Sequence, residues 1–213
     1  DWRSGAHMNT SVQRLDQPGV NLFEGDSGQF SQEALHAVGG ILRHGGALTA
    51  IACSTVNSYN GLVPRVGGFE GGTVTWAPTH MTYGHNNRSA MLRLPQNRFC
   101  IENRAADMCM NPYLSLGMTA AAMVDGIDSK ADPGVPLNED LYEMTDQAIA
   151  ASGAQRLPLH LLEATEILRD DRLAKHVLGD QMLESYVRYK VDEWERYHQQ
   201  VSDWEVEEYL RLY

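Results

Sequence analysis

Four arginines and one acid crowd into seventeen residues of this 213-residue chain: Arg88, Arg93, Arg98, Arg104 and Glu102. Arginine is always charged, and its planar fork matches the oxygens of a phosphate or a carboxylate. This segment contains too few acids to pair with four arginines, so the pattern predicts an anion-binding site. The alternative is a solvated face from which the arginines extend into water.

His7 and Glu102 are the candidates for a metal site, although they lie far apart in the sequence. A carboxylate among arginines either forms salt bridges or holds a divalent cation against phosphates that the arginines also grip. His7 has no H-x-x-x-H or H-E-x-x-H spacing to support it, and a lone histidine is usually structural. The residues alone leave the role of His7 open.

Residues 57–72, NSYNGLVPRVGGFEGG, contain five glycines and a proline, which favours a long loop able to approach a ligand closely. Glu70 lies near the middle of the glycines and could swing over a cleft. The alternative is an ordinary surface loop.

The elements that must position these groups are predicted from periodicity and end signals. A core helix is expected over 30–53 with Ser31 as N-cap, and strands over 74–83, 89–94 and 98–104. Because strand side chains alternate, Phe99 and Ile101 should point one way. The opposite face should carry Arg98, Cys100, Glu102 and Arg104.

The second half of the chain reads as helical. Asn111 and Pro112 form an N-cap and first-turn signal for a helix from 112, and further helices are expected over 139–151, 158–169 and 181–212. The last helix carries an apolar stripe that predicts packing on the domain rather than a coiled coil: Val187, Val191, Trp194, Val201 and Trp204.

Charge and composition exclude several classes of partner. Lys plus Arg total 17 against 28 Asp plus Glu, and the net charge of −11 opposes binding to nucleic acid or an anionic membrane. No apolar run is long enough for a membrane span, and the three cysteines lack metal-site spacing, so a reducing cytoplasm is expected. The chain begins at Asp1 inside a motif-like segment, so further residues are expected upstream.

Five segments resemble the glutamine synthetase family in order and spacing: SGAHMNTS at 4–11, NSYNGLVP at 57–64, NNRSAMLRLP at 86–95, CIENR at 100–104 and NPYLSLGMTAAAMVDGI at 111–127. The closing EW at 193–194, VSDWE at 201–205 and Tyr209 resemble the same family. The resemblance implies the C-terminal part of an α+β catalytic domain, with a curved antiparallel sheet backed by helices. Residues 1–110 would be its sheet-rich part, with the nucleotide, metal and glutamate motifs, and residues 111–213 its helical part.

The resemblance also implies residue roles and an activity. ATP would convert the γ-carboxylate of glutamate to γ-glutamyl phosphate, and an amine would displace the phosphate. Mg²⁺ or Mn²⁺ would be the metal. The implied roles are metal binding by His7 and Glu102, catalysis by Arg88, Arg93 and Glu70, glutamate binding by Arg104 and the Gly61 position, and ATP binding by Asn9, Ser11, Arg93 and Arg98. A large ring-shaped homo-oligomer with active sites between subunits is implied as well.

Departures from the family pattern cluster on the acceptor side. Gly61 stands where an arginine usually grips glutamate, and Arg65 or Arg3 could restore the charge. Cys100 replaces a nucleotide-side arginine, for which Arg98 could substitute. TWAPTHMTYGHNNRSAMLRLP resembles the branch of γ-glutamylamide synthetases that includes glutamate–methylamine ligases and enzymes acting on aniline. We therefore expect an organic amine as acceptor, with apolar volume from Phe69 and Trp76; the alternatives are a true glutamine synthetase using ammonia and a non-catalytic structural relative.

Overall fold

The computed structural model describes residues 4–62, 77–210 and 212 and contains one five-stranded sheet. The strands lie in the order β1-β4-β3-β2-β5. Their bounds are β1 (Met8–Thr10), β2 (His80–His85), β3 (Ala90–Leu94), β4 (Ile101–Asn103) and β5 (Gln155–Arg156). Three of the pairs are antiparallel, but β2 and β3 run parallel, so the sheet is mixed rather than purely antiparallel as expected.

The parallel pair is unusual because only residues 86–89 separate β2 from β3, whereas parallel neighbours usually need a crossover of a dozen or more residues. The side chain of Asn87 fixes this short connection. Its Nδ2 donates to the carbonyls of Leu137 and Glu139 at 2.7 and 2.8 Å. Its Oδ1 accepts from the backbone N–H of Ser89 at 2.8 Å and from the hydroxyl at 2.7 Å. The segment that carries Arg88 is therefore held from both sides.

The first predicted helix is divided in two. Ser31 caps α1 (Gln32–Arg43) as expected, by accepting from the N–H of Ala34 at 3.1 Å. The chain then turns at His44 before α2 (Gly45–Ala52). Short 3₁₀ helices η1 (Asp26–Gly28) and η2 (Val56–Gly61) lie on either side of this pair in the chain.

The second half is helical as predicted, with corrected boundaries. Asn111 caps α3 (Pro112–Ser129), and the later helices are α4 (Asp146–Ala151), α5 (Leu161–Asp170), α6 (Arg172–His198) and α7 (Asp203–Tyr209). The helix predicted over 139–151 is thus reduced to its last turn and a half. The one predicted over 181–212 starts earlier, kinks at Gly179 (φ +72°) and breaks before Ser202, which caps α7.

The strand boundaries are also corrected. The predicted strand 89–94 is confirmed as β3, whereas the strand predicted over 98–104 pairs only at Ile101–Asn103. The strand predicted over 74–83 begins at His80 and continues to His85, and its residues 74–76 lie outside the described part.

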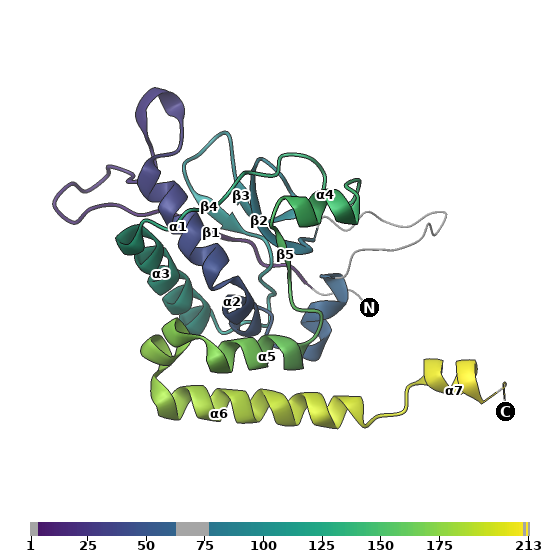
Figure 1. Cartoon of the computed structure of the whole chain (residues 1–213). Helices are drawn as coiled ribbons and strands as arrows, with labels where there is room; N and C mark the ends of the chain where they lie inside the picture. The colour runs from purple at the N-terminus through teal and green to yellow at the C-terminus, as the bar shows by residue number, and fades with distance from the viewer. Residues whose placement is uncertain (1–3, 63–76, 211, 213) are drawn as a thin grey trace.

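Five helices, α1, α2, α3, α5 and α6, contribute residues to the main hydrophobic core beside the sheet. Figure 1 shows α5 lying between α2 and α6, and residues from both halves of the chain share one buried cluster. Val187 and Trp194 of α6 pack against this cluster, whereas Val201 and Trp204 are exposed, so the predicted packing stripe holds only for the first part. Within the described residues, no helix is long and apolar enough to cross a membrane.

Candidate active site

A row of polar residues crosses three neighbouring strands on the face opposite the core. Asn9 of β1 lies directly across from Glu102 of β4, and Glu102 lies directly across from Arg93 of β3. Residues in register on adjacent strands project from the same face. Side chains along a strand alternate between its two faces, so His7 faces the same way as Asn9, and Arg104 the same way as Glu102. Five polar side chains therefore share this face.

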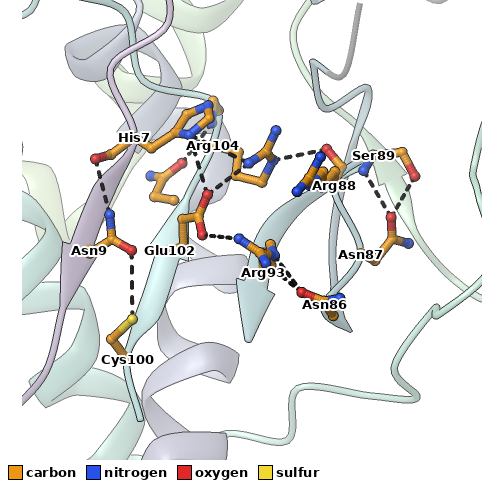
Figure 2. Close-up of polar contacts among 12 residues, drawn as sticks. His7, Asn9, Asn86, Asn87, Arg88, Ser89, Arg93, Cys100, Glu102 and Arg104 are labelled. Carbon is orange, nitrogen blue, oxygen red and sulfur yellow. Dashed lines mark hydrogen bonds and ion pairs between the residues drawn. The ribbon is translucent and has the colours of Figure 1, made fainter. Parts of the chain in front are cut away.

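Glu102 is the centre of this group, and Figure 2 shows the side chains converging on it. Its Oε2 lies 2.8 Å from Arg93 Nη1 and 3.6 Å from Arg98 Nη2. Its Oε1 lies 2.7 Å from Arg104 Nη1 and 3.3 Å from His7 Nδ1. The predicted common face of Arg98, Glu102 and Arg104 is therefore confirmed.

The electrostatics of Glu102 follow from these contacts. Burial by itself would raise the pKa of the Glu102 carboxyl, which is 2% exposed. The hydrogen bond from Arg104 and the charges of Arg104 and Arg93 outweigh burial and hold the pKa below its ordinary value. One carboxylate thus faces three guanidinium groups, and the excess positive charge favours an anion at this face.

Arg104 is buried to an extent that the solvated-face alternative does not allow, being only 5% exposed. Burial lowers the pKa of its guanidinium, and the hydrogen bond to Glu102 opposes that shift. Its Nε donates to the carbonyl of Arg88 at 2.9 Å. A buried cation is tolerated only when it is paired and hydrogen-bonded, so Arg104 has a fixed position.

Arg98 and Cys100 share the edge of the site next to β1. Arg98 Nη2 donates to Asn9 Oδ1 at 2.8 Å, and its Nε donates to Cys100 Sγ at 3.3 Å. Ser11 follows β1 directly and is exposed. Arg98 is 51% exposed in its side chain, which leaves it accessible to a ligand from solvent.

The remaining predicted site residues are less closely joined. Arg88 contributes its carbonyl to Arg104, and Figure 2 shows its side chain beside that of Arg104. Gly61 is buried at the end of η2. Glu70 lies outside the described residues, as do four others named above: Arg3, Arg65, Phe69 and Trp76.

Asn86 belongs to the site but was missed in the sequence. Its Oδ1 accepts from Arg93 Nε at 3.1 Å and also from Arg93 Nη2. The available signal was its position in NNRSAMLRLP, since asparagine tolerates the left-handed conformation that Asn86 adopts at φ +59°.

His7 and Glu102 fit a divalent cation as a partial ligand set. A carboxylate oxygen and an imidazole nitrogen are suitable ligands and lie 3.3 Å apart. Among the described residues, no group of three His, Cys, Asp or Glu side chains could hold a metal ion. Mg²⁺ commonly takes one or two carboxylates and completes its shell with water and phosphate oxygens, so two ligands from this stretch are consistent with it.

An arginine-rich sheet face with a carboxylate–imidazole pair has the chemistry that suits an anionic ligand such as a phosphate. The family comparison agrees with that chemistry. The family model described as "Glutamine synthetase, catalytic domain" matches residues 1–209, and the chain belongs to the glutamine synthetase family of ligases.

Relatives with different acceptors resemble the chain to similar degrees. Glutamate–methylamine ligase of Methyloversatilis universalis is 40% identical over 214 residues, covering 99% of this chain and 46% of the relative. Glutamine synthetase of Halobacterium salinarum is 36% identical over 217 residues, covering 99% and 45%. The chain thus spans somewhat less than half the length of these curated relatives.

Solved structures give the same fold. The structure "GmaS/ADP complex-Conformation 1" superimposes with a TM-score of 0.84 at 34% identity, covering 98% of this chain and 46% of that one. "Apo GmaS without ligand" gives 0.78 at 34% identity, covering 97% and 45%. The predicted α+β family fold is confirmed for this part of the domain.

Proposed function

We propose that the complete protein ligates an amine to the γ-carboxylate of glutamate at the expense of ATP, with an organic amine as the acceptor. The observation that carries the proposal is the arrangement around Glu102. Three guanidinium groups converge on one carboxylate and leave positive charge available at the face where a phosphoryl group would be transferred.

The chemistry requires such a face because a carboxylate is a poor electrophile. A γ-carboxylate oxygen of glutamate attacks the γ-phosphorus of ATP, the bond to the bridging oxygen of ADP breaks, and γ-glutamyl phosphate forms. The amine nitrogen then attacks the acyl carbon, phosphate leaves, and the nitrogen loses a proton. Repulsion between the anions is the main barrier, and fixed cations lower it.

Each site residue has a proposed role in these two reaction steps. Arg88 and Arg93 neutralise and orient the transferring phosphoryl group, and the buried Arg104 holds the carboxylates of glutamate. Asn9, Ser11 and Arg98 lie along the nucleotide side, where Arg98 takes the place of the arginine that Cys100 replaces. Arg93 contacts both the nucleotide and the phosphoryl group. Glu70 is proposed to close over the intermediate, with Gly61 bordering the glutamate site.

A divalent cation, Mg²⁺ or Mn²⁺, is proposed to bind His7 and Glu102. When bound, it would supply Lewis-acid neutralisation of the nucleotide phosphates. The pair lies beside Arg93, so the cation and this arginine would neutralise the phosphates together.

The organic amine is supported by the 40% identity to glutamate–methylamine ligase. Glutamine synthetases at 36–37% identity support ammonia as the other acceptor. Gly61 stands where the family pattern has a glutamate-binding arginine, which also favours a changed binding site for glutamate and the acceptor. A cytoplasmic location and a large ring of subunits with shared active sites are proposed with this function, as is the division into a sheet-rich 1–110 and a helical 111–213.

The test is ADP release by the complete protein with Mg²⁺, ATP and glutamate, in the presence of ammonium, methylamine, ethanolamine or aniline. Product mass identifies the γ-glutamyl compound. Turnover with an organic amine and little with ammonium supports the proposal. Preference for ammonium gives a true glutamine synthetase instead, and no turnover with any acceptor favours a non-catalytic relative.

A further inference from the structure

The side chain of Asn86 holds one edge of the Arg93 guanidinium. Asn86 Oδ1 accepts from both Nε and Nη2 of Arg93, and the Nε bond is 3.1 Å long. Arg93 Nη1 donates to Glu102 Oε2 at 2.8 Å. Figure 2 shows Arg93 between these two acceptors. The guanidinium is therefore fixed at two sides, by one neutral group and one charged group.

Asn86 is itself held in place by the backbone. It adopts φ +59°, which is uncommon for a residue other than glycine, and its N–H donates to the carbonyl of Leu94 at 2.9 Å. The next residue, Asn87, anchors the connection to Leu137 and Glu139. The backbone that carries the Asn86 amide is thus tied to the end of β3 and to the segment that contains Leu137 and Glu139.

The neutrality of this acceptor has a chemical consequence. A guanidinium has five N–H groups, and three of them take part in the bonds to Asn86 and Glu102. One N–H on each terminal nitrogen has no protein partner in the part of the chain that the structure describes. Each of these N–H groups can donate to an oxygen of a phosphate. An amide orients the fork without cancelling its charge, whereas a second carboxylate would compete with the anion.

We propose that Asn86 is a positioning residue for phosphoryl transfer, which orients Arg93 toward the transferring group while leaving its positive charge uncancelled. The inference rests on the proposed ligase function and adds to it a residue that acts through Arg93. Misplacement of a group that contacts the transition state by about 1 Å can lower the rate about a hundredfold, so the orientation of one guanidinium is large enough to measure.

Two variants separate orientation from charge. Asn86→Gly keeps the left-handed backbone and removes the amide, and we expect kcat to fall about 10- to 100-fold while the KM values for glutamate and amine stay unchanged. Asn86→Asp keeps an acceptor at the same place but adds a negative charge. We expect it to weaken binding of inorganic phosphate about tenfold or more, because the carboxylate competes with that anion for Arg93.

Lys130→Gly is the matched control for the backbone change. Lys130 is a second non-glycine residue in the left-handed region, at φ +51°, but it ends α3 and is exposed. Glycine at this position adopts the same left-handed backbone conformation more easily, and the change leaves the candidate active site unaltered. We expect wild-type kcat and wild-type phosphate affinity.

The complete protein is assayed in two ways: by ligase turnover, and by thermal stabilisation with increasing inorganic phosphate, which reports binding to the folded state without turnover. Wild-type kcat in Asn86→Gly overturns the positioning role, and wild-type phosphate affinity in Asn86→Asp overturns the role of neutrality. If wild-type protein shows no turnover with any amine, the proposed ligase function fails. The phosphate series then still decides whether Asn86 prepares Arg93 for an anion, and no stabilisation of wild type by phosphate contradicts it.

Discussion

Replacing Glu102 by glutamine should destabilise the protein strongly, because the Glu102 carboxylate pairs with the buried Arg104 at 2.7 Å. Glu102 and Arg104 are 2% and 5% exposed, so water can replace little of the lost interaction. Removing one partner of a buried ion pair costs about 3–5 kcal/mol. Glutamine retains one acceptor oxygen, and Arg98 is half exposed and screened, so we expect the lower end, about 3 kcal/mol.

The loss of stability in Glu102→Gln can be measured by thermal unfolding of the purified protein. About 3 kcal/mol corresponds to a decrease in Tm of roughly 6–12 °C for a domain of 150–250 residues. The matched control is Glu184→Gln, which removes the same charge at an exposed position on α6 and should change stability by no more than about 0.5 kcal/mol. The double variant Glu102→Gln/Arg104→Met removes both charges and should lose less stability than Glu102→Gln alone.

The difference in stability between wild type and Glu102→Gln should decrease as pH falls. The pKa of Glu102 is lowered in the folded state, so its contribution is present above the carboxyl pKa of the unfolded chain. That contribution is lost as pH falls through the folded-state pKa, and the difference between wild type and Glu102→Gln should shrink in acid. A loss at neutral pH no larger than that of the exposed control, about 0.5 kcal/mol, would refute the claim that the buried carboxylate holds the arginines together.

Two further stability predictions concern the helices that support the sheet. His44→Gln should lower stability by about 2 kcal/mol in acid and by less in alkali. The hydrogen bond to Asp171 raises the pKa of His44 in the folded protein. The stabilisation by His44 is therefore complete below the histidine pKa of the unfolded chain and is lost as pH rises through the folded-state pKa. Urea unfolding across pH tests this prediction, and an equal loss of stability at every pH would contradict it. Gly40→Ala should lower stability by about 3 kcal/mol, because a Cβ would lie 2.0 Å from the carbonyl of Ala122 where α1 crosses α3. At Gly117 the added Cβ would meet no described atom within 4 Å apart from its own helical turn, so Gly117→Ala should raise stability by about 1 kcal/mol and serves as the control in the same melts.

The parts of the fold that depend on local signals could be predicted from the sequence. Ser31 and Asn111 are caps because a short polar side chain accepts from the first free N–H groups of a helix, and both do so. Strand alternation placed Arg98, Glu102 and Arg104 on one face, as the ion pairs show. The family and its fold were also predicted from ordered motifs and are confirmed, whereas the residue roles stay predictions.

The parts that depend on distant partners could not be predicted. The parallel pairing of β2 and β3 depends on Asn87 bonding to Leu137 and Glu139, about fifty residues later in the chain. The break between α1 and α2 coincides with His44, whose ring bonds to Asp171 of the α5–α6 junction and lies 3.3 Å from Asp125 of α3. Neither contact changes the spacing of apolar residues in the sequence, so that spacing alone predicted one continuous helix over 30–53.

The contact between Asn86 and Arg93 was missed for a related reason. Side-chain spacing identified the arginines, but the orientation of Arg93 depends on a backbone dihedral and on a neutral oxygen. Neutral amides carry no charge pattern that could be recognised among the arginines.

Transfer of labelled oxygen tests the central claim most directly. The complete protein would be supplied with ATP, methylamine and glutamate labelled with ¹⁸O in its γ-carboxylate, and the released phosphate would be analysed by mass. Formation of γ-glutamyl phosphate predicts one ¹⁸O atom in each phosphate, because the attacking carboxylate oxygen leaves with phosphorus when the amine displaces it. Formation of the γ-glutamyl amide together with unlabelled phosphate would contradict the account.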